Sequence, residues 1–130
     1  MSKEVYVSFE TAKHLKEKEF DWKVFHFYDE NGTFRHREGD CYSLYNWNYP
    51  TKDGYGSRYC SAPTQQMACA WLEETYGIFI KIGRGMDINS NYYYSYNVLD
   101  KDNVGQIKSI RPSKEEAIAT ALEYVLTKLI

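Results

Sequence analysis

The chain has 130 residues and a mass of 15.3 kDa, which is the size of one ordinary domain and too small for two. Apolar residues make up 43 % of the chain and charged residues 26 %, a balance typical of a folded globular protein and not of a disordered one. Sixteen Lys and Arg residues against eighteen Asp and Glu residues give a formal charge of −2, which excludes a generic binder of nucleic acid or anionic lipid. We therefore expect a single domain over residues 1–130 with no nucleic acid among its partners.

The residues that follow Val7 are polar, and no apolar run reaches the length of about 18 residues that a membrane-spanning helix needs. The three cysteines, Cys41, Cys60 and Cys69, form an odd set at irregular spacing, which fits neither a disulfide framework nor a paired-cysteine zinc site. We expect a cytoplasmic protein without membrane contact and without a cofactor, whose thiols are buried as small hydrophobic groups.

A first helix is predicted to begin after Ser8, whose hydroxyl can accept a hydrogen bond from an unpaired amide of the first turn. Val7 can pack against Ala12 as a hydrophobic staple. The apolar face of this helix is narrow and consists of Phe9, Ala12 and Leu15, so we expect a surface helix that docks on one side only.

Residues 24–28 and 33–37 are rich in aromatic and β-branched side chains, and Asn31-Gly32 lies between them. Asn-Gly between two such runs predicts a β-hairpin, because both residues tolerate positive φ. With a two-residue turn, His26 and His36 point to opposite faces and cannot share a metal. A four-residue turn shifts the register and leaves their proximity open, and we expect no metal site.

The segment 40–61 stands out because its aromatic residues are mixed with Asn, Gly, Pro and basic side chains, with short strands expected near its two ends. Tyr together with Asn, Ser and Gly is the composition of adaptable recognition loops. Because the segment has few aliphatic residues that could bury its six large rings, we expect some of the rings to form a binding surface. The alternative is that the rings pack over the sheet. The candidate partner-binding residues are Tyr45, Trp47, Tyr49, Tyr55 and Arg58.

A second helix is predicted from about Pro63 to Tyr76, ended by Gly77 in a left-handed cap. Strands are predicted at residues 78–82, 92–99 and 104–110. In the second of these, three tyrosines alternate on one face and are expected to pack over the sheet: Tyr92, Tyr94 and Tyr96.

Ser113 and Glu116 form a capping box that opens a third helix. Its apolar stripe is expected to dock on the sheet through Ile118, Ala121, Leu122, Val125 and Leu129. The order α-β-β-(β)-α-β-β-β-α predicts an α+β fold, in which an antiparallel sheet carries three helices mainly on one face.

A resemblance to known proteins extends over nearly the whole chain. It is carried by three stretches: Val7–Phe20, Cys60–Gln65 leading into Trp71–Glu74, and Ser113–Ala121. In these stretches the chain resembles a group of small phage and prophage proteins of gut Bacteroidetes. The resemblance implies an origin in a mobile element and transfers no functional residue.

Residues 62–130 have the order helix, three strands, helix, which is similar in topology to a double-stranded RNA-binding domain. That family opens its last helix with several lysines that contact phosphates. Here Lys114 is followed by Glu115 and Glu116, whose carboxylates repel phosphate. The resemblance therefore implies a fold and argues against RNA binding through this helix.

The sequence contains no motif that indicates a catalytic site. No nucleophile elbow is present, and the Gly83–Asp87 segment, interpreted as a turn, lacks the spacing of a phosphate-binding loop. The carboxylates of Glu73 and Glu74 diverge by about 100° on a helix and cannot meet at one substrate atom. We expect a non-enzymatic interaction protein that binds an unknown protein partner or itself, with a nucleic-acid-binding module as the alternative.

Overall fold

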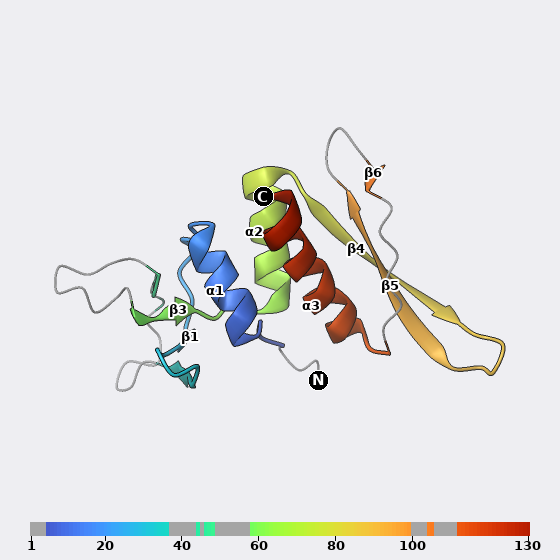
Figure 1. The fold of residues 1–130 in the computed structure, drawn as a ribbon, viewed down its shortest axis with the longest axis horizontal. Coiled ribbons are helices and arrows are strands. Elements are labelled where there is room, and N and C mark those ends of the chain that lie inside the picture. The colour runs from blue at the N-terminus through green and yellow to red at the C-terminus, as the bar shows by residue number, and fades with distance from the viewer. Residues whose placement is uncertain (1–4, 37–43, 45, 49–57, 100–103, 106–111) are drawn as a thin grey trace. The chain divides into compact units, whose positions relative to one another are not determined.

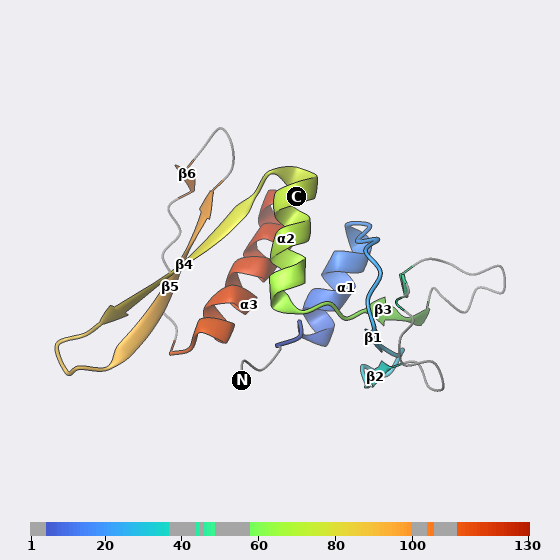
Figure 2. The ribbon, with the colours of Figure 1, turned by 180° about the vertical axis from the view of Figure 1, so that it is seen from behind.

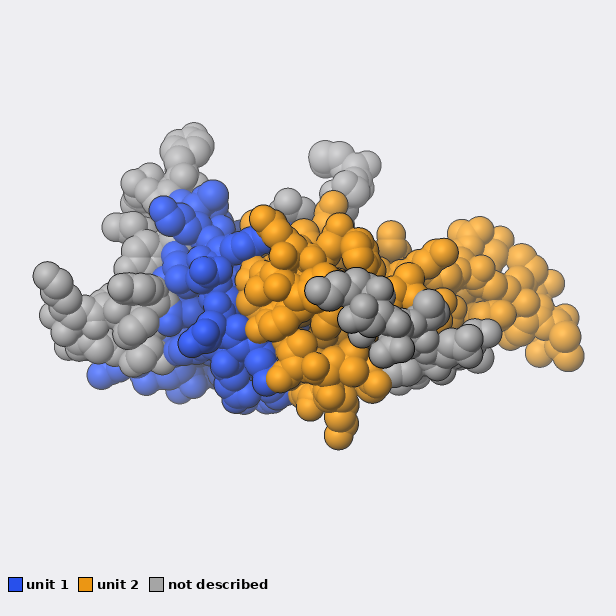
Figure 3. All heavy atoms as spheres, turned by 90° about the horizontal axis from the view of Figure 1, so that it is seen from above, with its two compact units in different colours: residues 1–64 blue, residues 65–130 orange. Residues whose placement is uncertain are grey.

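The computed structural model describes residues 5–36, 44, 46–48, 58–99, 104–105 and 112–130 (Figure 1). The chain divides into two compact units, residues 1–64 and 65–130, which Figure 3 distinguishes by colour. Helices and antiparallel strands follow in the order α1-β1-β2-β3-α2-β4-β5-β6-α3, so the predicted α+β class is confirmed and the order largely so. That the two units behave as one domain over residues 1–130 stays a prediction.

The strands form two three-stranded sheets, with orders β2-β1-β3 and β4-β5-β6, whereas the sequence analysis predicted one sheet. The physical reason is that strands pair most readily with their neighbours in sequence. A helix separates β3 from β4, so the strands before it and the strands after it each form their own sheet.

In the first unit, helix α1 (Phe9–Glu17) begins as predicted, because the Ser8 hydroxyl accepts a hydrogen bond from the Thr11 amide at 3.2 Å. Ala12 and Leu15 are completely buried, while Phe9 is only partly buried and packs its ring 5.5 Å from that of Tyr28. The helix is thus docked on one side, and its contacts with β3 lie within this unit.

The predicted hairpin is present as β1 (His26–Tyr28) and β2 (Phe34–His36), and β3 (Cys60–Ser61) adds to the other edge of β1. Its turn is longer than two residues: the Asp29 amide donates to the Thr33 carbonyl at 3.0 Å. Gly32 has a φ of 80°, which glycine adopts without strain. The register therefore pairs His26 with His36 on one face, and the loop between Asp29 and Thr33 has three residues, so neither the two-residue nor the four-residue turn is correct.

In the second unit, helix α2 (Gln65–Tyr76) buries Ala68, Trp71 and Leu72. Gly77 ends it with a φ of 70°, as predicted, and its amide donates to the Glu73 carbonyl at 3.0 Å. Helices α2 and α3 lie side by side, and α3 covers one face of β4 and β5 (Figures 1 and 2).

Strands β4 (Phe79–Met86) and β5 (Tyr92–Leu99) form a hairpin of eight pairs, and β6 (Val104–Gly105) pairs with the end of β5. The prediction of a turn over Gly83–Asp87 is wrong, because β4 continues to Met86. The reversal is made instead by Asp87, whose carboxylate accepts hydrogen bonds from the amides of Asn89 and Asn91.

The hairpin extends past the end of α3 (Figures 1 and 2). The burial of its three alternating tyrosines therefore decreases toward the tip of the hairpin. Tyr96 is 3 % exposed, Tyr94 is partly buried and Tyr92 is 54 % exposed. The expected packing therefore holds for Tyr96, whereas the Tyr92 ring lies 4.4 Å from the Arg84 guanidinium carbon near the tip.

Helix α3 (Lys114–Tyr124) opens with the predicted cap, since the Ser113 hydroxyl accepts from the Glu116 amide at 3.2 Å. Its last residues, Val125–Leu129, form a π-helical turn, in which the Ile130 amide donates to the Val125 carbonyl. The buried stripe passes through Leu126, which lies four residues after the completely buried Leu122 and so shares its side of the helix. It leaves out Leu129, which the stripe was predicted to include and which is 45 % exposed.

None of the helices in the described part of the chain is both long enough and apolar enough to cross a membrane. Both thiols within the described ranges have raised pKa values, and burial raises the pKa of Cys69 to about 11. These two cysteines are therefore poor nucleophiles near neutral pH.

We predict that Leu122→Ala lowers the free energy of unfolding by about 2–5 kcal/mol, because Leu122 is completely buried and truncation leaves a cavity. Leu129→Ala is the control in the same helical segment and should change the free energy by less than about 1 kcal/mol. Urea unfolding followed by circular dichroism measures both. Equal effects of the two substitutions would contradict this buried stripe.

Candidate functional site

The sheet of the first unit carries different side chains on its two faces. The register pairs Phe27 with both Arg35 and Ser61, so these three residues share one face. His26 and His36 share the other face, because side chains alternate along a strand.

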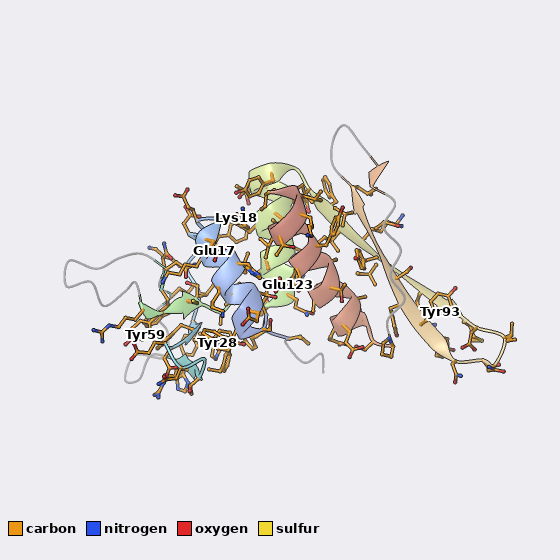
Figure 4. The ribbon with its side chains drawn as sticks, in the orientation of Figure 1. Glu17, Lys18, Tyr28, Tyr59, Tyr93 and Glu123 are labelled. Atoms are coloured by element: carbon orange, nitrogen blue, oxygen red, sulfur yellow. The ribbon has the colours of Figure 1, made fainter. Side chains whose placement is uncertain are left out.

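A pocket of about 640 Å³ lies over the Phe27 face, within the range of volumes typical of ligand sites. It gathers residues from the hairpin, its turn and the segment that leads into β3. Tyr59, which is one of them, is labelled in Figure 4. The lining residues are Phe27, Asp29, Glu30, Asn31, Arg35, His36, Trp47, Arg58 and Tyr59.

Three aromatic rings form the apolar part of this pocket. Phe27 stacks on Trp47 with ring centroids 4.0 Å apart and planes inclined by 26°. Tyr59 packs against both rings, at 4.8 Å from Phe27 and 6.1 Å from Trp47. Phe27 is 7 % exposed, whereas Trp47 and Tyr59 are only partly buried, so the latter two present accessible ring surface to the pocket.

Trp47 is held in place by hydrogen bonds at both its backbone and its ring. Its amide donates to the Ser61 hydroxyl at 3.0 Å, and its indole Nε1 donates to the Val24 carbonyl at 3.2 Å. The neighbouring Asn48 accepts from the Ser61 amide and donates to the Phe20 carbonyl, both at 2.9 Å. Trp47 thus packs on the sheet with one part of its ring and lines the pocket with another.

The charged side of the pocket is organised by Asp29. Its carboxylate accepts hydrogen bonds from the amides of Asn31 and Thr33, each at 2.9 Å, and pairs with Arg35 through Nε at 2.6 Å. The Thr33 amide and then the Arg35 side chain lower the pKa of Asp29 below its ordinary value. Glu30 and Arg58 are exposed, so the rim presents one charge of each sign.

The structure brings together two of the five residues that the sequence predicted for partner binding, Trp47 and Arg58. Tyr45, Tyr49 and Tyr55 lie outside the described residues. The hairpin also contributes to the pocket, above all through Phe27 and Asp29, which were not among the predicted site residues. An Asp two residues before Asn31 was an available signal, because Asp side chains commonly organise turns.

The opposite face of this sheet carries a second aromatic cluster. His26 stacks on Phe34 with centroids 4.7 Å apart, and its ring lies 6.1 Å from that of His36. Tyr6 contacts both His26 and Phe34. Among the residues that the structure describes, no group of three or more His, Cys, Asp or Glu side chains gathers around a metal-sized space.

Comparison with known proteins adds no assignment, since no protein family, no curated protein and no solved structure matches this chain.

We predict that Asp29→Asn destabilises the protein at pH 7 and that this effect shrinks in acid. The folded state lowers the pKa of Asp29, so its carboxylate stabilises the fold above the unfolded value of about 4 and loses this contribution as the pH falls through the folded value. Urea unfolding at pH 7 and near pH 2.5 measures the difference between parent and variant.

The control for this measurement is Glu30→Gln, which removes an exposed carboxylate at the neighbouring position. It should change the free energy of unfolding little at either pH. A loss from Asp29→Asn that is equally large at both pH values would show that the charge of Asp29 is not what stabilises the turn.

Proposed function

We propose that this chain is a small, non-enzymatic interaction protein of a mobile element, which binds a segment of a protein partner in the pocket of the first unit. The observation that carries the proposal is the lining of that pocket. The partly buried rings of Trp47 and Tyr59 line the pocket together with Arg58. Trp, Tyr and Arg are the residue types most enriched at energetically important positions of protein interfaces.

The dimensions and the rigidity of the pocket support this function. A volume of about 640 Å³ accommodates one large apolar side chain of a partner together with its neighbours. The rings are positioned before any partner arrives, because hydrogen bonds hold Trp47 and the turn at Asp29. A preorganised surface loses less conformational entropy on binding.

The charges favour a peptide over a nucleic acid. Asp29 and Arg35 neutralise each other as an ion pair, and the remaining Glu30 and Arg58 carry opposite charges, so the lining has no excess of positive charge to attract phosphate groups. The exposed Glu30 and Arg58 instead suit a segment that has an apolar anchor flanked by charges of both signs.

The same lining argues against catalysis through a hydroxyl, thiol or amine nucleophile at this site. The described lining contains no Ser, Thr, Cys or Lys side chain that could serve as an activated nucleophile. Asp29 is a weak base, because its hydrogen bonds to two amides and to Arg35 stabilise the carboxylate.

We predict that a peptide selected from a random displayed library against the folded protein binds at this pocket, and that Arg58→Glu weakens its affinity at least about tenfold. Arg58 is exposed, and the melting temperature of the variant is measured beside the affinity, so that a loss of fold is distinguished from a loss of contact with the peptide. Trp47→Ala is less informative, because it also removes the stacking on Phe27 and the hydrogen bond to Val24.

The matched control is Lys23→Glu, a charge reversal at an exposed position of the same unit that does not line the pocket. Isothermal titration of the selected peptide should give the parent affinity within about twofold for this variant. Failure to select any peptide, or equal weakening by both reversals, would refute binding at this pocket.

The alternative function, nucleic-acid binding, predicts a different result. The first turn of α3 exposes Glu115 and Glu116, where a double-stranded RNA-binding domain has lysines. We therefore predict no gel shift of duplex RNA at micromolar protein and physiological salt. A shift that weakens as salt is added would favour the alternative, because counterion release has that signature.

A further inference from the structure

The longest strand edge that the structure describes is the outer edge of β4. Its eight residues pair with β5 on one side, and no described strand pairs with the other side. The edge strands β2 and β6 are three and two residues long. A long unpaired edge offers a row of backbone donors and acceptors to another strand, and β4 contains no proline that would block such an addition.

The two faces of β4 differ in chemistry. Ile80, Ile82 and Arg84 share the face that packs on the helices, because they pair with Val98, Tyr96 and Tyr94. The outer face carries Phe79, Lys81, Gly83 and Gly85, and the exposed fraction of Phe79 is 46 %.

Gly85 creates a specific feature on the outer face. The ring of Tyr93, which is labelled in Figure 4, lies directly over Gly85, where an added Cβ would clash with the ring carbon Cζ. Glycine at this position therefore allows the ring to lie across β4 toward the free edge. Phe79, on the same face of β4, is 46 % exposed.

We propose that a second copy of this chain occupies this edge, with the two β4 strands antiparallel and Ile82 on the two-fold axis. In this register Phe79 of each copy lies opposite Gly85 of the other, beside the ring of Tyr93. Two aromatic contacts and a central Ile82 pair then stabilise the dimer on opposite faces of the joined sheet.

Charge also favours this register. Lys81 lies opposite Gly83 of the second copy, and Arg84 lies opposite Ile80, so no two like charges face each other directly. Moving the axis by half a residue, to the midpoint between Ile82 and Gly83, would place Lys81 opposite Arg84 and separate Phe79 from Gly85. Like charges opposite each other are unfavourable in a ladder.

The first test measures the mass of the full chain by light scattering coupled to size exclusion, loaded at about 5 to 200 µM, a range suited to an interface this small. The parent should form a dimer whose fraction rises with concentration. Phe79→Ala should weaken the dimer at least fivefold without a change in melting temperature, since Phe79 is half-exposed. The matched control Phe34→Ala, at a ring 42 % exposed in the other unit, should dimerise as the parent does.

The second test determines the register by mild oxidation of single-cysteine additions, followed by mapping of the cross-linked peptides. Ile82→Cys should give a disulfide that joins the substituted position of one copy to the same position of the other. Gly83→Cys should not cross-link to its copy, because it lies opposite Lys81, and its added Cβ meets only the movable Ser95 hydroxyl at 3.1 Å. A monomeric parent at every concentration, or a cross-link at position 83 in place of 82, would overturn the proposal.

Discussion

The carboxylate of Asp29 is the group on which the first unit depends most. It accepts hydrogen bonds from the amides of Asn31 and Thr33 and pairs with Arg35, and these contacts close a turn that is longer than two residues. The length of a turn sets the register of its hairpin. Asp29 thereby decides that Phe27 and Arg35 share the pocket face, while His26 and His36 share the other, although His36 also lines the pocket from the edge strand β2.

A second constraint acts on the segment that precedes β3. Ser61, in β3, holds this segment through two hydrogen bonds: its hydroxyl accepts from the Trp47 amide, and its own amide donates to the Asn48 side chain. Completely buried, Ser61 has no access to water that could replace these partners. The pocket is therefore built from backbone and side-chain hydrogen bonds that fix the rings before a partner binds, which supports a role in recognition.

In the second unit the same alternation of faces has a different outcome, because the hairpin is longer than the helix that covers it. Tyr96, near the helices, completes the core, while Tyr92, near the tip, remains at the surface. Phe79 is exposed for another reason, because it lies on the outer face of β4, whose outer edge pairs with no described strand. The proposed binding pocket thus lies in one unit, and the strand edge proposed for self-pairing, which no described strand covers, lies in the other.

The local features can be predicted from the amino acids alone, because each depends on neighbouring residues: the caps at Ser8 and Ser113, the left-handed end at Gly77, the hairpin and the α+β class. Composition also points to Trp47 and Arg58. The hairpin register, the division into two sheets and the burial of Leu126 in place of Leu129 are visible only in the folded chain. The register depends on the side-chain bonds of Asp29 and the two sheets depend on which strands meet in space, and no periodicity of apolar residues encodes either of them.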